Sequence, residues 1–121
     1  MIETAGLTHI HLAVRDLTRS VAFYKTVFGM KDLERGEEGM VFLRTPGAAD
    51  TITLRLAGAE EPVGSAGGLD HFGFRLKDAA ALDEAVRQIV AAGGRLIERG
   101  EHAPGDAYAY VADPDGYVIE L

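Results

Sequence analysis

Cysteine is absent from this chain of 121 residues. Its absence excludes a disulfide framework, a cysteine-type zinc site and a cysteine nucleophile. Long hydrophobic runs are also missing, since no apolar stretch approaches the ~20 residues that a membrane-spanning helix needs. The N-terminus lacks the basic and apolar regions of a secretory signal peptide. We therefore expect a soluble, cytoplasmic protein without a membrane partner.

Positive charge is scarce. Twelve Lys and Arg residues stand against nineteen Asp and Glu, which gives a net charge of −7 and a pI near 5.0. This balance argues against a nucleic-acid partner, because binding to a phosphate backbone depends on clustered positive charge. The apolar share of 47% and the charged share of 26% are typical of a globular protein. The length predicts one domain, residues 1–121.

The first half of the chain follows the order strand, helix, strand, strand. Residues 9–14 alternate between apolar and other side chains, which is the pattern of a half-buried strand. Asp16 or Thr18 can then cap a helix that ends at Gly29. Two further runs have strand-like composition, at residues 40–43 and 51–56.

The second half has the same order. Residues 71–76 alternate as the first strand does, and Asp78 can cap a helix that ends at Gly93 and Gly94. The later strands are predicted at residues 108–111 and 117–121, with the turn Asp113–Gly116 between them.

The two halves match in register, since His9 and His71, and Asp16 and Asp78, are each 62 positions apart. An internal repeat dictates architecture, and the alternative is a chance alignment of two α+β hairpins. We therefore predict an α+β fold of two βαβββ repeats, which can pair into a curved mixed sheet around a trough. The repeat units are predicted to span about residues 6–57 and 68–121, with a Gly-rich link between them.

Three polar side chains are predicted to face the trough. Residues i and i+2 share a face of a strand, so His9 and His71 lie on the side of their strands opposite the core, as does Glu120. If the two units pair about a pseudo-twofold axis, these three converge. Two imidazoles and a carboxylate at a half-open site suit Fe(II), Mn(II) or Zn(II). The alternative is that each is an ordinary solvated or hydrogen-bonded residue.

Several segments resemble the vicinal oxygen chelate superfamily. The first unit carries the resemblance in Thr8–Leu17, Ser20–Tyr24 and Val27–Met30, and the second carries it in Asp70–Phe74 and Asp113–Leu121. This superfamily includes glyoxalase I, extradiol dioxygenases, fosfomycin- and bleomycin-resistance proteins and methylmalonyl-CoA epimerase. The resemblance covers nearly the whole chain.

The resemblance implies one divalent metal ion (Fe, Mn, Zn or Ni) held by His9, His71 and Glu120. It also implies a small-molecule substrate with two vicinal oxygens and a homodimeric assembly. Four-ligand members carry Glu or Gln on the fourth strand of the first unit, where this chain has Thr53. We therefore expect a three-ligand site.

The resemblance to the dioxygenases of the superfamily extends to two further residues, His102 and Tyr110. Either side chain can donate to a bound oxyanion, although a solvated loop histidine and a packed strand tyrosine are the plain alternatives. Glu120 is the evident carboxylate base, so the expected catalytic residues are Glu120, Tyr110 and His102. Arg55 and Arg75 are candidates to meet a substrate carboxylate, or else are exposed strand residues.

These features predict a metal-dependent enzyme of the glyoxalase/dioxygenase type. Its reaction would be an extradiol-type oxygenation or a glyoxalase-type isomerisation. The alternative is a non-catalytic protein that sequesters a drug, as bleomycin-resistance proteins do. The charge of −7 and the aromatic residues Phe42, Tyr108 and Tyr110 allow that alternative.

Overall fold

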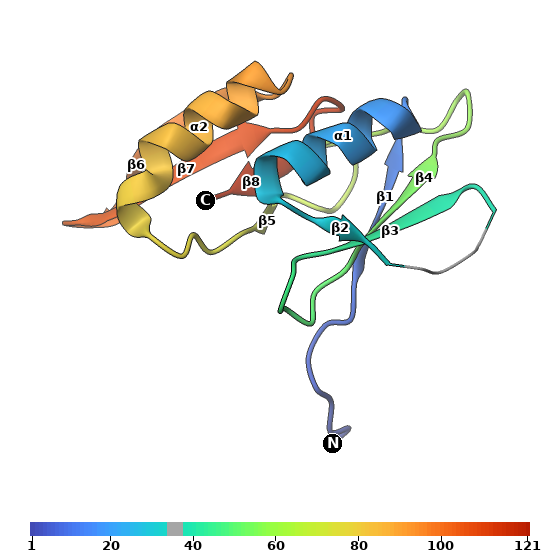
Figure 1. Cartoon of the computed structure of the whole chain (residues 1–121), viewed down its shortest axis with the longest axis horizontal. Coiled ribbons are helices and arrows are strands. Elements are labelled where there is room, and N and C mark those ends of the chain that lie inside the picture. The colour runs from blue at the N-terminus through green and yellow to red at the C-terminus, as the bar shows by residue number, and fades with distance from the viewer. Residues whose placement is uncertain (34–37) are drawn as a thin grey trace.

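The computed structural model describes residues 1–33 and 38–121. Two four-stranded sheets lie in it, with strand orders β1-β4-β3-β2 and β5-β8-β7-β6. Figure 1 shows α1 and α2 along the same side of the molecule, with one sheet beneath each helix. The predicted α+β fold of paired βαβββ units is therefore confirmed. In the described residues, hydrogen bonds join strands only within each sheet, so the two sheets do not close into one.

The first unit contains all the elements that the alternation predicted and one short strand that it did not. Its elements are β1 (Ile10–Val14), α1 (Leu17–Phe28), β2 (Lys31–Asp32), β3 (Met40–Arg44) and β4 (Ile52–Leu56). Strand β1 pairs with β4 in parallel, and β3 pairs with β2 and β4 antiparallel. A parallel pair at one edge with antiparallel partners beyond it is the sheet of one βαβββ unit.

The second unit repeats this topology. Its elements are β5 (Phe72–Gly73), the 3₁₀ turn η1 (Ala79–Ala81), α2 (Leu82–Ala91), β6 (Arg95–Ala103), β7 (Asp106–Ala112) and β8 (Val118–Glu120). Strand β5 is parallel to β8, and β7 is antiparallel to both β6 and β8. The order of the first sheet thus recurs in the second.

Capping residues set the ends of the helices. The side chain of Asp16 accepts a hydrogen bond from the backbone N–H of Arg19, and Gly29 ends α1 with a φ of 64°, a value that favours glycine. Asp78 accepts from the backbone N–H of Ala80. It therefore caps η1 rather than α2, which begins one turn later at Leu82.

The first strand of the second unit is shorter than predicted. Alternation extends over residues 71–76, but only Phe72 and Gly73 form a ladder with β8. The backbone N–H of Phe74 still donates to the carbonyl of Glu120, at 2.9 Å. Strand β8 covers only Val118–Glu120, so β5 has a partner strand over a short length. The sequence alternation extends beyond the strand because Phe74 and Leu76, in the loop that follows, still pack against the core.

Apolar side chains between the helices and the sheets form one continuous core. Phe23 and Tyr24 of α1 are buried there, together with Leu12 of β1 and Ile119 of β8. The units also meet directly, since the rings of Phe28 and Phe74 stack with centroids 4.0 Å apart. No helix in the described part of the chain has the length and hydropathy needed to cross a membrane.

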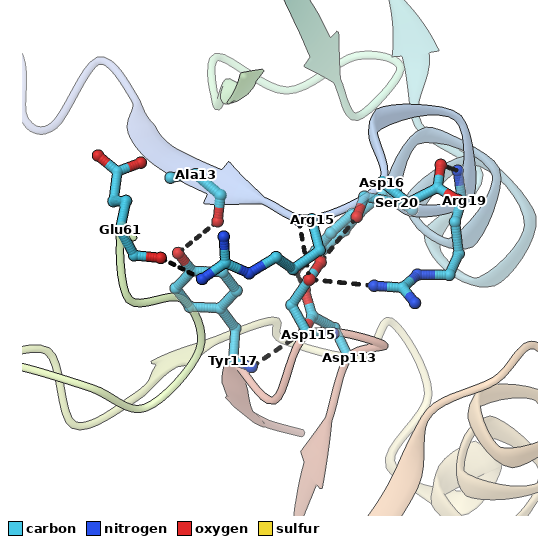
Figure 2. Close-up of polar contacts among 10 residues, drawn as sticks. Ala13, Arg15, Asp16, Arg19, Ser20, Glu61, Asp113, Asp115 and Tyr117 are labelled. Atoms are coloured by element: carbon cyan, nitrogen blue, oxygen red, sulfur yellow. Dashed lines mark hydrogen bonds and ion pairs between the residues drawn. The ribbon is translucent and has the colours of Figure 1, made fainter. Parts of the chain in front are cut away.

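Polar contacts centred on the Asp113–Gly116 turn fasten the second unit to the first (Figure 2). Oδ1 of Asp115 accepts from the backbone N–H of Arg15 and from the guanidinium of Arg19, each at 3.0 Å. Its Oδ2 accepts from the hydroxyl of Ser20, also at 3.0 Å. The side chain of Asp115 has no exposed surface. The sequence predicted this segment only as a turn between two strands. In the structure, the turn also holds the two units in place relative to each other.

Candidate functional site

The two sheets hold equivalent residues in equivalent positions. In the first sheet, His11 of β1 lies opposite Thr53 of β4, and in the second sheet, Gly73 lies opposite Glu120. Thr53 therefore occupies the position in the first unit that Glu120 occupies in the second. His9 and His71 lie two residues before His11 and Gly73, so they share the corresponding face of each unit. The register predicted from the repeat is the register of the fold.

His71 and Glu120 converge on the open face of the second sheet. Nε2 of His71 lies 3.1 Å from Oε2 of Glu120, and Nδ1 lies 2.6 Å from Oδ2 of Asp70. The hydrogen bond to Asp70 is the main cause that raises the pKa of His71, and the charge of Glu120 adds to it. A histidine that donates from Nδ1 to a carboxylate presents Nε2 to a metal in a fixed orientation.

His102 is the second imidazole on Glu120. Its Nε2 lies 2.6 Å from Oε1 of Glu120, and its ring stacks on Tyr108 with centroids 4.3 Å apart. This hydrogen bond is the largest cause that holds the pKa of Glu120 below its ordinary value. The His102 side chain is half exposed. Its imidazole therefore contacts the carboxylate of Glu120 and is also accessible to solvent.

Tyr110 borders the same cluster. It pairs with Glu120 across β7 and β8, and its ring lies 5.0 Å from that of His71, edge to face. Partial burial raises the pKa of Tyr110, and the charge of Glu120 raises it further. The phenol is protonated at neutral pH, as an unshifted tyrosine also is, so it can donate a hydrogen bond.

Within the single chain, His9 forms no contact with His71 or Glu120 among the described residues. It is exposed, and its Nδ1 lies 2.7 Å from the hydroxyl of Thr8. It lines a pocket over the first sheet together with Thr53 and Phe42, whereas Glu120 and His102 line a pocket over the second. The structure thus brings together His71, Glu120 and the predicted catalytic residues.

The full metal-ligand set is not assembled within one chain. In residues 1–33 and 38–121, no group of three His, Asp or Glu side chains has a geometry that could hold a metal ion. The chemistry of the donors nevertheless fits a divalent cation, because His71 and Glu120 offer an imidazole and a carboxylate side by side. A third ligand is needed from elsewhere, and the set His9, His71 and Glu120 stays a prediction.

Asp70 is the residue in this cluster to which the sequence analysis gave no role. Asp70 directly precedes His71 and belongs to the segment Asp70–Phe74 that resembles the superfamily. A carboxylate next to a candidate metal ligand is the sequence feature that could have indicated its role. The role depends on a side-chain rotamer that places Oδ2 against Nδ1, and spacing alone does not reveal a rotamer.

Comparison with known proteins gives matches over nearly the whole chain. The family model described as "Glyoxalase/Bleomycin resistance protein/Dioxygenase superfamily" matches residues 6–121. Lactoylglutathione lyase of Salmonella typhimurium is 34% identical over 126 residues, which cover 95% of this chain and 90% of that protein. Metapyrocatechase of a Pseudomonas species is 26% identical over 93% of this chain, but only 36% of that enzyme is covered.

Solved structures have the same fold. The fosfomycin resistance protein FosX of Listeria monocytogenes matches with a TM-score of 0.77 at 22% identity, over 98% of this chain and 93% of that one. A variant of FosX, with a TM-score of 0.77 and 23% identity, was solved with Mn(II) and a dihydroxypropylphosphonic acid, and the match covers 98% of this chain and 90% of that one. At this identity the likeness supports the fold alone.

Proposed function

Since the chain belongs to the Glyoxalase/Bleomycin resistance protein/Dioxygenase superfamily, we propose that it is a divalent-metal-dependent enzyme acting on a small substrate with two adjacent oxygens. The observation that carries the proposal is the cluster on the open face of the second sheet. There, two imidazoles contact the two oxygens of one carboxylate, with His71 on Oε2 and His102 on Oε1 of Glu120.

The metal ligands are His71 and Glu120 of one chain and His9 of a second copy. The equivalent placement of His9 and His71 in the two sheets supports this set, because two copies related by a twofold axis can oppose the open face of one unit to that of the other. His9 directly precedes β1 (Ile10–Val14), and Figure 1 shows the N-terminal segment before β1 extending away from the sheet. The active protein is therefore a homodimer with sites shared between subunits.

A divalent ion held there would bind both substrate oxygens and stabilise negative charge on them. His102 is placed to move a proton, because it contacts Glu120 while half of its side chain remains exposed. Tyr110 donates a hydrogen bond to an anionic oxygen, since its ring borders His71 and its strand position faces Glu120. Asp70 orients His71.

The reaction is either an oxygenation or an isomerisation. The lyase and metapyrocatechase relatives support one alternative each. An isomerase needs a base that shuttles a proton, and with Thr53 in the first unit that base is Glu120 or His102. Oxygen consumption with Fe(II) and a catechol identifies an oxygenase. Anaerobic loss of the hemithioacetal of methylglyoxal and glutathione identifies an isomerase.

Metal content tests the ligand set. In protein purified without added metal, we expect near one divalent ion per chain and the mass of a dimer by light scattering. His71→Ala and His9→Ala should each lose most of the metal, because two remaining ligands rarely hold such an ion. His11→Ala is the matched control, since His11 is an exposed histidine on the same strand face as His9. Full occupancy in the His71 variant, or loss in the His11 variant only, contradicts the set.

The role of His102 has its own test. His102→Gln should keep the metal and lower turnover by roughly 10²-fold or more, as loss of a general acid–base does. A drug-sequestering protein gives a different result, namely metal-free protein that binds an aromatic drug in stoichiometric amount. The exposed stack of His102 on Tyr108 is the feature that favours this second function.

A further inference from the structure

An open pocket lies beside Glu120 on the second sheet. It has a volume of ≈ 580 Å³. The polar side chains among its lining residues are those of Arg75, His102, Asp106, Tyr108 and Glu120. A substrate held at Glu120 and His71 therefore has room to extend into a space that contains one guanidinium.

The charge of Arg75 has no partner among the described residues, where no hydrogen bond or ion pair of its side chain is found. Six other arginines do have partners: Arg15 with the carbonyls of Gly58 and Glu61, Arg19 with Asp115, Arg44 with the carbonyl of Asp50, Arg55 with Glu61, Arg87 with Glu84, and Arg99 with Asp83. In a protein with a net charge of −7, an arginine left unpaired in a pocket is available to a ligand.

Arg75 lies close in sequence to the residue that pairs with Glu120, and it lines the same pocket. Gly73 lies directly opposite Glu120. Arg75 follows two residues later, after the strand has ended, so its Cα lies at most roughly 7 Å from that of Gly73. That span is comparable to one six-membered ring with its substituents. A ligand that places two oxygens near Glu120 can thus reach Arg75 with a group on the far side of a single ring or of a short chain.

We propose that Arg75 binds a carboxylate of the substrate, so that the enzyme acts on anionic compounds that carry vicinal oxygens and, one ring or short chain away, a carboxylate. This rests on the proposed function. A guanidinium matches a carboxylate through two parallel hydrogen bonds. Asp106 lines the same pocket, and its negative charge opposes part of this attraction for an anion.

Within the described part of the first unit, residues 1–33 and 38–57, there is no equivalent subsite. The arginine of its pocket, Arg44, donates from Nε to the carbonyl of Asp50 at 3.2 Å. Arg55, the other arginine considered from the sequence, forms an ion pair with Glu61 through both terminal nitrogens. Of the two arginines that the sequence analysis named, Arg75 is therefore the one with a free guanidinium.

The test compares two ligands that carry the same vicinal hydroxyls, one with a free carboxylate and one in which a methyl ester removes its charge. Anaerobic Co(II)-loaded protein is titrated with 3,4-dihydroxybenzoate or with its methyl ester, and the visible absorption of Co(II) reports chelation by the two hydroxyl oxygens. We expect the acid to bind about tenfold more tightly than the ester, as a charge-assisted bidentate contact allows. In Arg75→Gln this preference should vanish, with little change for the ester.

Matched variants define the controls. Arg95→Gln removes another arginine without a described side-chain partner, on β6 and outside this pocket, and should keep the preference for the acid. Asp106→Asn should strengthen binding of the acid. Equal affinities for acid and ester in the unsubstituted protein, or an unchanged preference in Arg75→Gln, overturn the inference and leave the proposed function standing. A Co(II) spectrum that neither ligand changes contradicts vicinal-oxygen chelation itself and the role of Arg75 with it.

Discussion

The hydroxyl of Tyr24 donates a hydrogen bond to Oδ2 of Asp113 at 2.8 Å. The pair connects helix α1 of the first unit to the turn before β8 of the second, and both side chains are buried. Oδ1 of Asp113 meanwhile accepts from the backbone N–H groups of Asp115 and Tyr117. One buried carboxylate therefore organises the turn and also ties it to the other unit.

Removal of the Tyr24 hydroxyl should destabilise the protein. Tyr24→Phe keeps the ring and its packing but leaves Oδ2 of Asp113 buried without this donor, which costs about 1–3 kcal/mol of the free energy of unfolding. Urea denaturation measures the change. Tyr108→Phe is the control, because that hydroxyl also bonds a carboxylate, Glu98 at 2.8 Å, but at the surface. Equal stability of the Tyr24 variant and the unsubstituted protein contradicts the role of the pair.

Alkaline pH should reveal the same contact. Burial, followed by the charge of Asp113, raises the pKa of Tyr24 well above its ordinary value of 10.0. As the pH rises past that value, the unfolded chain loses the tyrosine proton while the folded chain keeps it, so stability falls. In Tyr24→Phe the fall between pH of about 9 and about 11 should be shallower. Urea denaturation at a series of pH values tests this, and parallel profiles of the two proteins contradict it.

Local pattern predicted the elements that have one buried face. Strand β1 and helix α1 have clear periodicity. Of the two predicted N-caps, Asp16 and Thr18, the structure has Asp16, and Gly29 ends α1 as predicted. Strand β6 gave no such signal, because eight of its nine residues are exposed and its sequence does not alternate. Strand β2 has only two residues, too few for any period.

The sequence did not predict the contacts between residues that are far apart along the chain. Asp115 lies 100 positions from Arg15 and 95 from Ser20, and nothing in either local sequence specifies that they meet. The same limit applies to the site. The repeat placed His71 and Glu120 on one face, whereas the contacts of Asp70 and His102 depend on rotamers and on the course of the long β6–β7 hairpin.

Asp70 should strengthen metal binding without touching the metal. Its carboxylate holds Nδ1 of His71 at 2.6 Å, and loss of such a partner typically lowers metal affinity by about 10–100-fold. Asp70→Asn should show this weakening in competition with a chelator of known affinity. Asp32→Asn serves as control, because Asp32 is an exposed carboxylate that pairs with Lys25 in the first unit. Similar affinities of the two variants contradict the positioning role.

Thr53 should have no part in metal binding. It occupies the position in the first sheet that Glu120 occupies in the second, but a neutral hydroxyl is a poor ligand for a divalent ion. Thr53→Val removes the hydroxyl at nearly constant volume and should leave the metal content unchanged by elemental analysis. A lower metal content would contradict the three-ligand site.

The opposite substitution tests how many coordination positions remain open. An octahedral ion with three protein ligands keeps three positions for substrate or oxygen, and a fourth protein ligand takes one of them. Thr53 is only 2% exposed but lines the pocket over the first sheet, so the carboxylate in Thr53→Glu has that space to enter. Two positions then remain, which is enough for two substrate oxygens but leaves none for a further ligand such as oxygen. Metal should therefore bind more tightly while turnover of a vicinal-oxygen substrate falls, with circular dichroism as the check that the variant is folded. If a folded variant binds the metal more tightly and turns over the substrate equally well, the new carboxylate has not taken a position that the reaction uses, and the position next to Thr53 is not one that substrate or oxygen occupies.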